Sequence, residues 1–353
     1  MSYSKKIYKK DSKGKLRVLH VYTEGADLIQ ESGLLGGKLT IHRSTAKAKN
    51  VGKSNETTPQ QQAVLQAESK VKDKLSGEYF NTVTETDTAE VFGPMLAQDA
   101  KKHMEKIVFP CWVQPKLDGQ RGNGRHQQPL LSRTGKVIDT MAHIQEEIDK
   151  IGISDYLDGE LYAHGLTFQE NMKLIKKYRP GKSELVKYHV YDLALPMPFE
   201  RRYETLSALI SGAGYEHIEL VPSYKVNDME ELLRYHAQFL KQGYEGTMIR
   251  HTDAPYGVSK RDRQLLKYKD FIDIAAKVVD VVPSDKDPLQ GIVECEIEAG
   301  KFRCGMKFSH AEREEILTNK TDYIGRMAEI RFFEHTDDGL PRFPVCYGFR
   351  NDK

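Results

Sequence analysis

The chain has 353 residues, enough for two or three domains that each bury a core of their own. A hydrophobic content of 39%, a mean hydropathy of −0.59 and the lack of any apolar run of roughly 18 residues exclude a membrane-spanning helix. No signal-peptide pattern opens the chain, and the four cysteines form no CxxC pair, which argues against disulfides and a zinc site. We therefore expect a protein of the cytoplasm, or of the host-cell cytoplasm if the source is viral, that is not secreted and contacts no membrane.

The first 80 residues have the pattern of a small basic domain. Short alternating runs such as 15–22 and a glycine-rich stretch at 33–37 indicate an antiparallel sheet within the first 56 residues. A helix follows, with Thr58, Pro59 and Gln61 at its N-cap, N1 and N3 positions and Gly77 at its end. The whole chain has a net charge of only +2, yet residues 1–80 hold 15 Lys and Arg against 8 Asp and Glu. Local positive charge favours contact with phosphates, and a solvated basic surface is the alternative.

Residues 81–91 are predicted to form a linker, because threonines and acidic residues leave little apolar surface to bury. The next region, 92–269, alternates apolar runs of strand type with capped helices. One helix is predicted to begin after Asn227, with Glu230 completing a capping box, and to end at Gly243. The clearest predicted strands of this region are 112–117, 156–162, 187–193 and 246–250.

The last region, 270–353, has the pattern of a small β-barrel. Residues 274–282 and 292–298 alternate between apolar and polar side chains, and Gly300 follows at a predicted turn. A helix with Ser309 at its N-cap and Glu312 in the capping box separates these strands from further strands near the end of the chain.

The chemistry centres on the string Lys116-Leu117-Asp118-Gly119-Gln120-Arg121, which follows an apolar strand. A lysine at the end of a buried strand is partly desolvated, which favours the free amine that a nucleophile needs. Gly119 permits close approach of the backbone to a ligand, and Arg121 can hold a phosphate with two hydrogen bonds. Taken alone, the string could also be a surface turn of mixed charge.

Further strings follow in a fixed order. They are Ser132-Arg133-Thr134-Gly135, Asp158-Gly159-Glu160-Leu161-Tyr162, Val190-Tyr191-Asp192, Glu245-Gly246-Thr247-Met248-Ile249-Arg250, Leu266-Lys267-Tyr268-Lys269, and Arg342-Phe343-Pro344 with Arg350 and Asp352. Together with the Lys116 string, this series resembles the successive nucleotidyltransferase motifs of the covalent family that includes ATP-dependent DNA ligases, RNA ligases and mRNA capping enzymes. The resemblance covers about 94–353 of this chain.

The resemblance implies an α+β fold in three parts. An adenylation domain of antiparallel sheets and helices would occupy 92–269, and an OB-fold barrel would occupy 270–353. A small α+β domain at 1–80 would precede the linker at 81–91. In the family the barrel closes over the nucleotide and opens again, so we expect a hinge near Lys269-Asp270.

The resemblance also implies a role for each matching position. Lys116 is the expected nucleophile, which attacks the α-phosphate of ATP and carries AMP, and the expected metal is Mg²⁺, for which Mn²⁺ can substitute. Glu160 and Glu245 are the expected metal ligands. Asp118, Lys267 and Lys269 join Lys116 in the expected catalytic set. The residues expected to bind ATP or AMP are Gln114, Lys116, Arg121, Glu160, Tyr191, Arg250, Arg342 and Arg350.

Most of these side chains have a plainer interpretation when each is taken alone. Glu160 and Glu245 could be ordinary carboxylates, and Tyr191 could pack in a core instead of stacking on adenine. Lys267 and Lys269, two apart on a predicted strand, face one side, where they either reach a common phosphate or form a solvated surface. The ordered series of strings favours the functional interpretation.

The residues expected to contact DNA lie in two regions of the chain. Arg133 is expected at the nick, and Lys47, Lys49 and Lys53 are expected to bind DNA. Residues 36–80 resemble the WGR-type modules that bind DNA near breaks, although the tryptophan and the arginine of that signature are not evident here.

The predicted function is therefore an ATP-dependent DNA ligase that acts as a monomer on nicked duplex DNA. It would form lysyl-AMP, transfer AMP to the 5′-phosphate and join the 3′-hydroxyl with release of AMP. One alternative is an RNA ligase or a capping enzyme, the latter with GTP in place of ATP. The other is a DNA-binding scaffold without activity.

Overall fold

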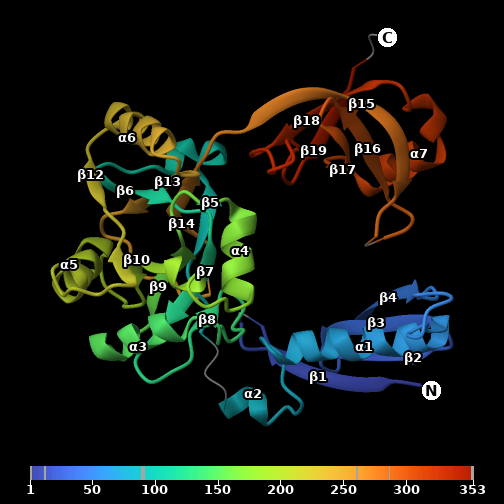
Figure 1. Cartoon of the computed structure of the whole chain (residues 1–353), viewed down its shortest axis with the longest axis horizontal. Coiled ribbons are helices and arrows are strands. Elements are labelled where there is room, and N and C mark those ends of the chain that lie inside the picture. The colour runs from blue at the N-terminus through green and yellow to red at the C-terminus, as the bar shows by residue number, and fades with distance from the viewer. Residues whose placement is uncertain (1, 12, 89–91, 260, 286, 351–353) are drawn as a thin grey trace. The chain divides into compact units, whose positions relative to one another are not determined.

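The computed structural model describes residues 2–11, 13–88, 92–259, 261–285 and 287–350 (Figure 1). The chain divides into two compact units, Met1–Tyr268 and Lys269–Lys353. Among the described residues, no helix is both long enough and apolar enough to cross a membrane.

The first unit begins with a four-stranded antiparallel sheet that one helix covers. The strands run in spatial order β1 (Ser4–Lys10), β2 (Leu16–Glu24), β3 (Asp27–Leu34) and β4 (Leu39–Thr45). Helix α1 (Pro59–Leu75) packs Ala67 and Val71 against Ile7, Val21 and Leu28 of the sheet. The predicted capping box of Thr58 and Gln61 is confirmed. Within the predicted linker, the short helix α2 (Glu85–Thr88) forms, and residues 89–91 lie outside the described part of the chain.

Two five-stranded sheets form the rest of the first unit. The first has the order β11 (Ile218–Leu220), β10 (Lys187–Leu193), β9 (Leu157–Tyr162), β7 (Gln120–Gly124), β8 (Leu131–Ser132). The second has the order β12 (Tyr224–Val226), β6 (Cys111–Lys116), β13 (Gly246–His251), β14 (Arg261–Tyr268), β5 (Leu96–Asp99). The helices are α3 (Ala142–Ile151), α4 (Phe168–Lys176), α5 (Phe199–Ile210) and α6 (Met229–Lys241).

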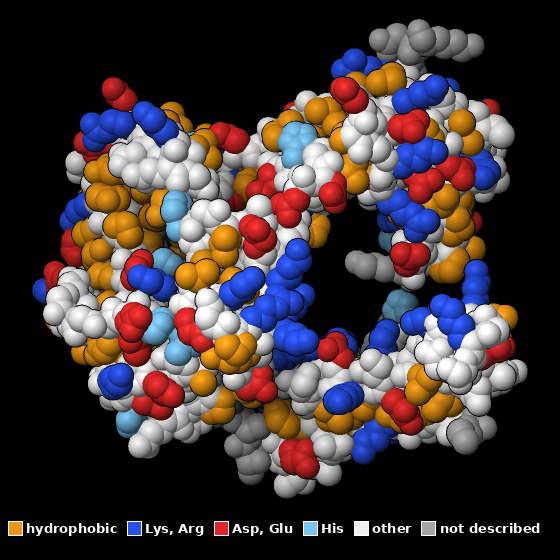
Figure 2. Space-filling view, in the orientation of Figure 1, with side chains coloured by type: hydrophobic (Ala, Val, Ile, Leu, Met, Phe, Trp, Pro, Cys, Tyr) orange, Lys and Arg blue, Asp and Glu red, His pale blue; other side chains and the backbone are white. Residues whose placement is uncertain are grey.

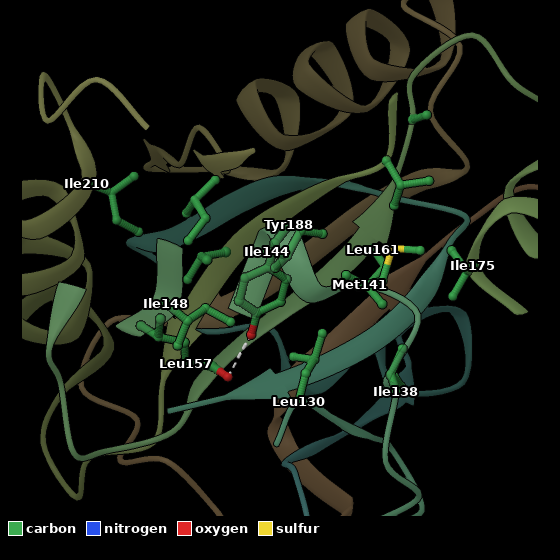
Figure 3. Packing of buried hydrophobic residues seen from close by; sticks show 14 of the residues in the cluster. Leu130, Ile138, Met141, Ile144, Ile148, Leu157, Leu161, Ile175, Tyr188 and Ile210 are labelled. Carbon is green, nitrogen blue, oxygen red and sulfur yellow. Dashed lines mark hydrogen bonds between the residues drawn. The ribbon is translucent and has the colours of Figure 1, made fainter. Parts of the chain in front are cut away.

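The largest core cluster packs helices onto the first of these two sheets. Ile144 and Ile148 of α3 and Ile210 of α5 meet Leu157 and Tyr188 of the strands (Figure 3). The buried hydroxyl of Tyr188 lies 2.8 Å from the carbonyl oxygen of Leu157 and 3.0 Å from that of Gly122, and its single hydrogen is shared between these two acceptors. A tyrosine is accommodated in this apolar core because its one polar group finds acceptors there.

Helix α6 begins one residue later than the sequence predicts. Asp228 is extended, and its side chain accepts the backbone N–H of Glu231 at 2.9 Å. Asn227 instead donates its backbone N–H to the Glu231 carboxylate at 2.8 Å. The predicted cap at Asn227 with Glu230 is therefore wrong by one position. Both Asn and Asp are good N-caps, so the backbone conformation decides between neighbours.

The second unit is a closed barrel with the strand order β15 (Ile272–Pro283), β16 (Gly291–Ile297), β17 (Gly300–Met306), β19 (Val345–Phe349), β18 (Met327–Phe332). Helix α7 (His310–Thr318) carries the predicted capping box of Ser309 and Glu312, which is confirmed. Val278, Phe302, Ile330 and Phe332 fill the interior. Closure of the sheet leaves this small domain without open strand edges.

All four cysteines are buried and free of disulfides, so we expect them to be unreactive in the folded protein. Burial raises the pKa of the Cys111 and Cys295 thiols to about 12 and that of Cys346 to about 11. Because the thiolate is the reactive form, native protein at pH 8 should react slowly with a thiol-specific chromogenic disulfide. All four thiols should react rapidly once the protein is unfolded in guanidinium. A fast phase from native protein would contradict this prediction.

Candidate active site

A cavity of about 470 Å³ lies within the first unit and is lined by strands of both five-stranded sheets. Side chains from β6, β7, β9, β10, β13 and β14 reach it, together with α4 and the turn after β8. Among the polar residues that line it are Gln114, Lys116, Arg121, Arg133, Glu160, Tyr191, Arg250 and Lys267. Figure 2 shows Lys and Arg side chains gathered on this unit near α4, as expected of a surface that attracts phosphates.

Lys116 is the last residue of β6, and the register of the sheet places Glu245 beside it. Gly246 pairs with Lys116 across β13 and β6, and the Glu245 backbone N–H donates to the Lys116 carbonyl at 2.9 Å. The Glu245 carboxylate forms an ion pair with the Lys116 ammonium. The Lys116 side chain is 21% exposed and that of Glu245 only 6%. A nearly buried carboxylate thus holds the amine at the edge of the cavity.

Glu160 lies on β9, directly opposite Arg121 of β7. Burial raises the pKa of the Glu160 carboxyl to about 8, with opposing effects from Lys116 and Arg121 and reinforcing effects from Asp158 and Glu245. Glu160 and Glu245 therefore approach Lys116 from two different sheets. Such a pair of carboxylates around one amine suits a cation or a proton transfer.

Gly119 is required by the fold at this point. A Cβ atom there would lie 2.2 Å from the Leu161 carbonyl oxygen and 3.0 Å from Cγ of Glu160. Only glycine permits β9 to come so close to the loop after Lys116. From the sequence we expect this glycine to let the backbone approach a ligand. In the structure its close neighbour is strand β9.

Arg121 is held by a buried carboxylate. Its Nε donates to Asp158 at 2.7 Å, and the Tyr256 hydroxyl donates to the same carboxylate at 2.7 Å. The guanidinium carbon also lies 5.8 Å from the centre of the Tyr191 ring. Two of the donors of Arg121 are thus committed to Asp158, which leaves its remaining donors for a phosphate.

Arg250 belongs to a buried network beneath the cavity. Its Nε donates to the Gln114 side-chain oxygen at 2.6 Å, and its Nη1 forms an ion pair with Asp192. Arg202 of α5 donates to the same Asp192 at 2.7 Å. The Gln114 amide donates to the Tyr191 carbonyl at 3.0 Å and to Ser223 Oγ at 2.8 Å. This network fixes the strand that carries Tyr191, whose ring lies 5.4 Å from the Arg250 guanidinium.

The two motif lysines after β13 do not share a strand. Lys267 lies on β14 and lines the cavity. The strand ends at Tyr268, and Lys269 belongs to the second unit, where its ammonium lies 4.1 Å from the centre of the Phe333 ring. The expectation that both lysines face one side of a strand is therefore wrong for Lys269. The Lys269 ammonium also lies 5.5 Å from the centre of the Phe271 ring, a second cation–π contact.

The other predicted site residues lie outside the cavity, apart from Arg133. Asp118 is half-buried and adds to the effect of burial, which raises the pKa of the Tyr162 hydroxyl to about 12. Arg342 is buried in the second unit and forms an ion pair with Glu334, and Arg350 lies 3.6 Å from Glu329. The first-domain lysines predicted to bind DNA are exposed on the loop between β4 and α1; they are Lys47, Lys49 and Lys53.

Several lining residues were missed by the sequence interpretation. Arg261 lies on β14 at the cavity and donates to the Ala97 carbonyl at 2.7 Å. Phe168 and Met172 of α4, and Met248 of β13, supply apolar surface. The spacing of six between Arg261 and Lys267 on one strand was an available signal, because residues an even number apart share a face.

A cavity with a lysine at its edge in a two-sheet domain, followed by a closed five-stranded barrel, is the arrangement that the sequence predicts for a nucleotidyltransferase with an OB-type domain. Comparison with known proteins agrees. The ATP-dependent DNA ligase domain matches residues 94–269, and the DNA ligase OB-like domain matches residues 289–350. The chain belongs to the ATP-dependent DNA ligase family, and it is an enzyme that joins DNA with ATP.

Relatives share roughly a quarter of their residues with this chain. The DNA ligase of Enterobacteria phage T4 is 26% identical over 330 residues, which cover 72% of this chain and 67% of that one. The DNA ligase of African swine fever virus, isolate Warthog/Namibia/Wart80/1980, is 28% identical over 352 residues, which cover 89% and 81%. A solved structure from a study of minimal-scaffold DNA binding by Lig E DNA ligases is 26% identical with a TM-score of 0.64, and covers 74% of this chain and 100% of that chain.

Proposed function

We propose that this ligase seals nicks in duplex DNA through a covalent lysyl-AMP on Lys116. The observation that carries the proposal is the position of the Lys116 amine at the cavity, with two carboxylates from different sheets beside it. The amine nitrogen attacks the α-phosphorus of ATP, the bond to the pyrophosphate oxygen breaks, and a phosphorus–nitrogen bond forms. We propose that Glu245, which is ion-paired with this ammonium, accepts the proton that it must lose first.

The nucleoside would lie over Tyr191. The Arg121 and Arg250 guanidinium carbons lie 5.8 and 5.4 Å from the centre of its ring, and Gln114 donates to its backbone carbonyl. We propose that adenine stacks on the part of the ring that lines the cavity. Arg121 and Arg133 are proposed to contact phosphates at the opening. Lys267, which reaches the cavity from β14, would neutralise charge on the reacting phosphate. We propose that Asp118 and Lys269, which do not line the cavity, belong to the same catalytic set.

Glu160 and Glu245 fit a divalent metal. Carboxylate oxygens are ligands that Mg²⁺ and Mn²⁺ prefer. Burial raises the pKa of Glu160 by disfavouring its charged form, and a bound cation would offset this effect. Among the described residues, no group of three or more His, Cys, Asp or Glu could hold a metal ion, so such an ion would also bind water and substrate phosphates. When bound, the ion would reduce charge repulsion within the triphosphate and stabilise the leaving pyrophosphate.

In the second and third steps AMP passes to the 5′-phosphate at the nick, and the 3′-hydroxyl then displaces it. We propose that Arg133 contacts this 5′-phosphate and that Lys47, Lys49 and Lys53 bind the flanking duplex. Arg342 and Arg350 of the barrel would contact the departing pyrophosphate in the first step by exchanging their partners Glu334 and Glu329 for it. The hinge of this movement would lie next to Lys269, between parts that we propose as 1–80, 81–91, 92–269 and 270–353.

Labelling tests the proposal. Protein incubated with Mg²⁺ and α-labelled ATP should retain label on Lys116 by peptide mapping, and α-labelled GTP should leave none. Added nicked duplex should discharge the label onto the DNA 5′-phosphate and then yield sealed product. Label that maps to another residue, or that does not pass to DNA, would overturn the proposed mechanism.

A further inference from the structure

A short turn that faces the active-site cavity follows strand β8. Ser132, Arg133 and Thr134 all line the cavity. The turn is closed by hydrogen bonds from the Gly135 N–H to the Ser132 carbonyl at 2.9 Å and from the Lys136 N–H to Ser132 Oγ at 3.0 Å. Gly135 has a φ of 78°, which glycine adopts without strain. The front of this Arg133 turn (residues 132–135) therefore belongs to the active site.

The back of the Arg133 turn lines a second cavity of about 410 Å³, also within the first unit. This cavity lies where the end of α1 meets the adenylation domain, and Thr134 lines both cavities. The other residues around it are Lys9, Asp73, Lys74, Gly77, Glu78, Tyr79 and Lys136. A single turn thus separates the reacting centre from the first domain.

The end of α1 contacts the turn through both a side chain and the backbone. Asp73 forms an ion pair with Lys136, the residue directly after the turn, and this partner holds the pKa of Asp73 below its usual range. Gly77 lies so close that an added Cβ atom would be 3.0 Å from the Thr134 carbonyl oxygen.

We infer that the first domain positions the Arg133 turn for the nick, with Asp73 and Lys136 as the positioning residues. This inference rests on the proposed role of Arg133 at the 5′-phosphate. A two-residue strand and a four-residue turn restrict a long arginine only weakly, and each further contact reduces the conformations that must be lost when DNA binds.

Direct DNA binding in the second cavity is the competing interpretation. Three lysines line it, but Lys9 is paired with Glu78 at 2.6 Å and Lys136 with Asp73. Two of the three positive charges are therefore already neutralised within the protein. A site built for the phosphate backbone would leave its cations available. The pairing favours a structural role, in which the Asp73–Lys136 ion pair joins the first domain to the Arg133 turn. We call this ion pair the Asp73 brace.

The charge reversal Asp73→Lys separates these two interpretations. It removes one negative charge and adds one positive charge, so direct binding predicts tighter association with nicked DNA. If the ion pair is structural, the rate of AMP transfer should instead fall, because two lysines would repel each other next to the turn. We expect pre-adenylated Asp73→Lys enzyme to transfer AMP to a saturating nicked duplex roughly three- to fivefold more slowly in single-turnover measurements, the size expected for an ion pair with side chains 66% and 38% exposed. Lysyl-AMP formation from ATP should remain unchanged.

Three further variants complete the experiment. Lys136→Asp alone should also transfer AMP more slowly than the wild type. The double variant Asp73→Lys with Lys136→Asp should regain the wild-type rate of transfer, because the ion pair is restored with reversed polarity. Glu68→Lys makes the same charge change at an exposed site of α1 and should transfer AMP at the wild-type rate. The proposed role of the Asp73 brace would be contradicted if Asp73→Lys transferred AMP as fast as Glu68→Lys, or if the double variant stayed slow. A wild-type enzyme that forms no adenylated DNA would instead remove the proposed function itself.

Discussion

Lys116→Ala should abolish lysyl-AMP formation and sealing from ATP. No other amine is expected to replace it, because Lys267, which also reaches the cavity, comes from β14 on the far side of β13 from β6. Loss of a nucleophile removes the reaction path and not merely part of its stabilisation, so the rate should fall by more than about 1,000-fold. The measurement is label retained from α-labelled ATP, with mass spectrometry of the intact protein.

The same variant offers its own control for folding. A nick that already carries AMP on its 5′-phosphate needs no protein nucleophile, so Lys116→Ala enzyme should still join it. Lys225→Ala is a matched control, since Lys225 lies on β12 beside β6 and is paired with Glu200 outside the cavity. Continued self-adenylation by the Lys116 variant would exclude this residue as the nucleophile.

Removal of residues 1–90 should weaken binding to nicked duplex by about 10- to 100-fold and leave lysyl-AMP formation nearly intact. Residues 1–80 of this segment hold 15 Lys and Arg against 8 Asp and Glu, and each lost phosphate contact releases one fewer counterion on binding. The affinity should also depend less steeply on salt, by roughly 0.9 in the log–log slope for each contact removed. Titration of labelled nicked DNA at several salt concentrations measures both quantities.

A smaller variant refines this second prediction. Lys47, Lys49 and Lys53 changed together to alanine should reproduce part of the loss in affinity, because these side chains are exposed and removable without disturbing the core. If the truncated enzyme instead failed to form lysyl-AMP, the first domain would be part of the catalytic core. That outcome would be separate from the Asp73 brace, which acts on AMP transfer.

Local chemistry was sufficient for most secondary structure. Thr58 with Gln61 and Ser309 with Glu312 form the capping boxes that their spacing predicts, since both partners lie within one helical turn. Alternating runs became strands of the first sheet and of the barrel. The error at Asn227 and Asp228 is also local, because two neighbouring residues compete for one cap and only the backbone geometry chooses between them.

The ordered motifs predicted which side chains gather, and the structure places Lys116, Arg121, Glu160, Tyr191, Arg250 and Lys267 around one cavity. Their partners were not predictable. Arg121 is held by Asp158, Arg250 by Asp192 and Arg342 by Glu334, and Lys269 turns to rings of the barrel. The ligase family thus follows from the amino-acid sequence alone, and so does the proposal that Lys116 is the reactive lysine. Which charges are already paired, and which turn the first domain supports, depend on strand register and domain packing between residues far apart in the chain, and only the tertiary structure decides these.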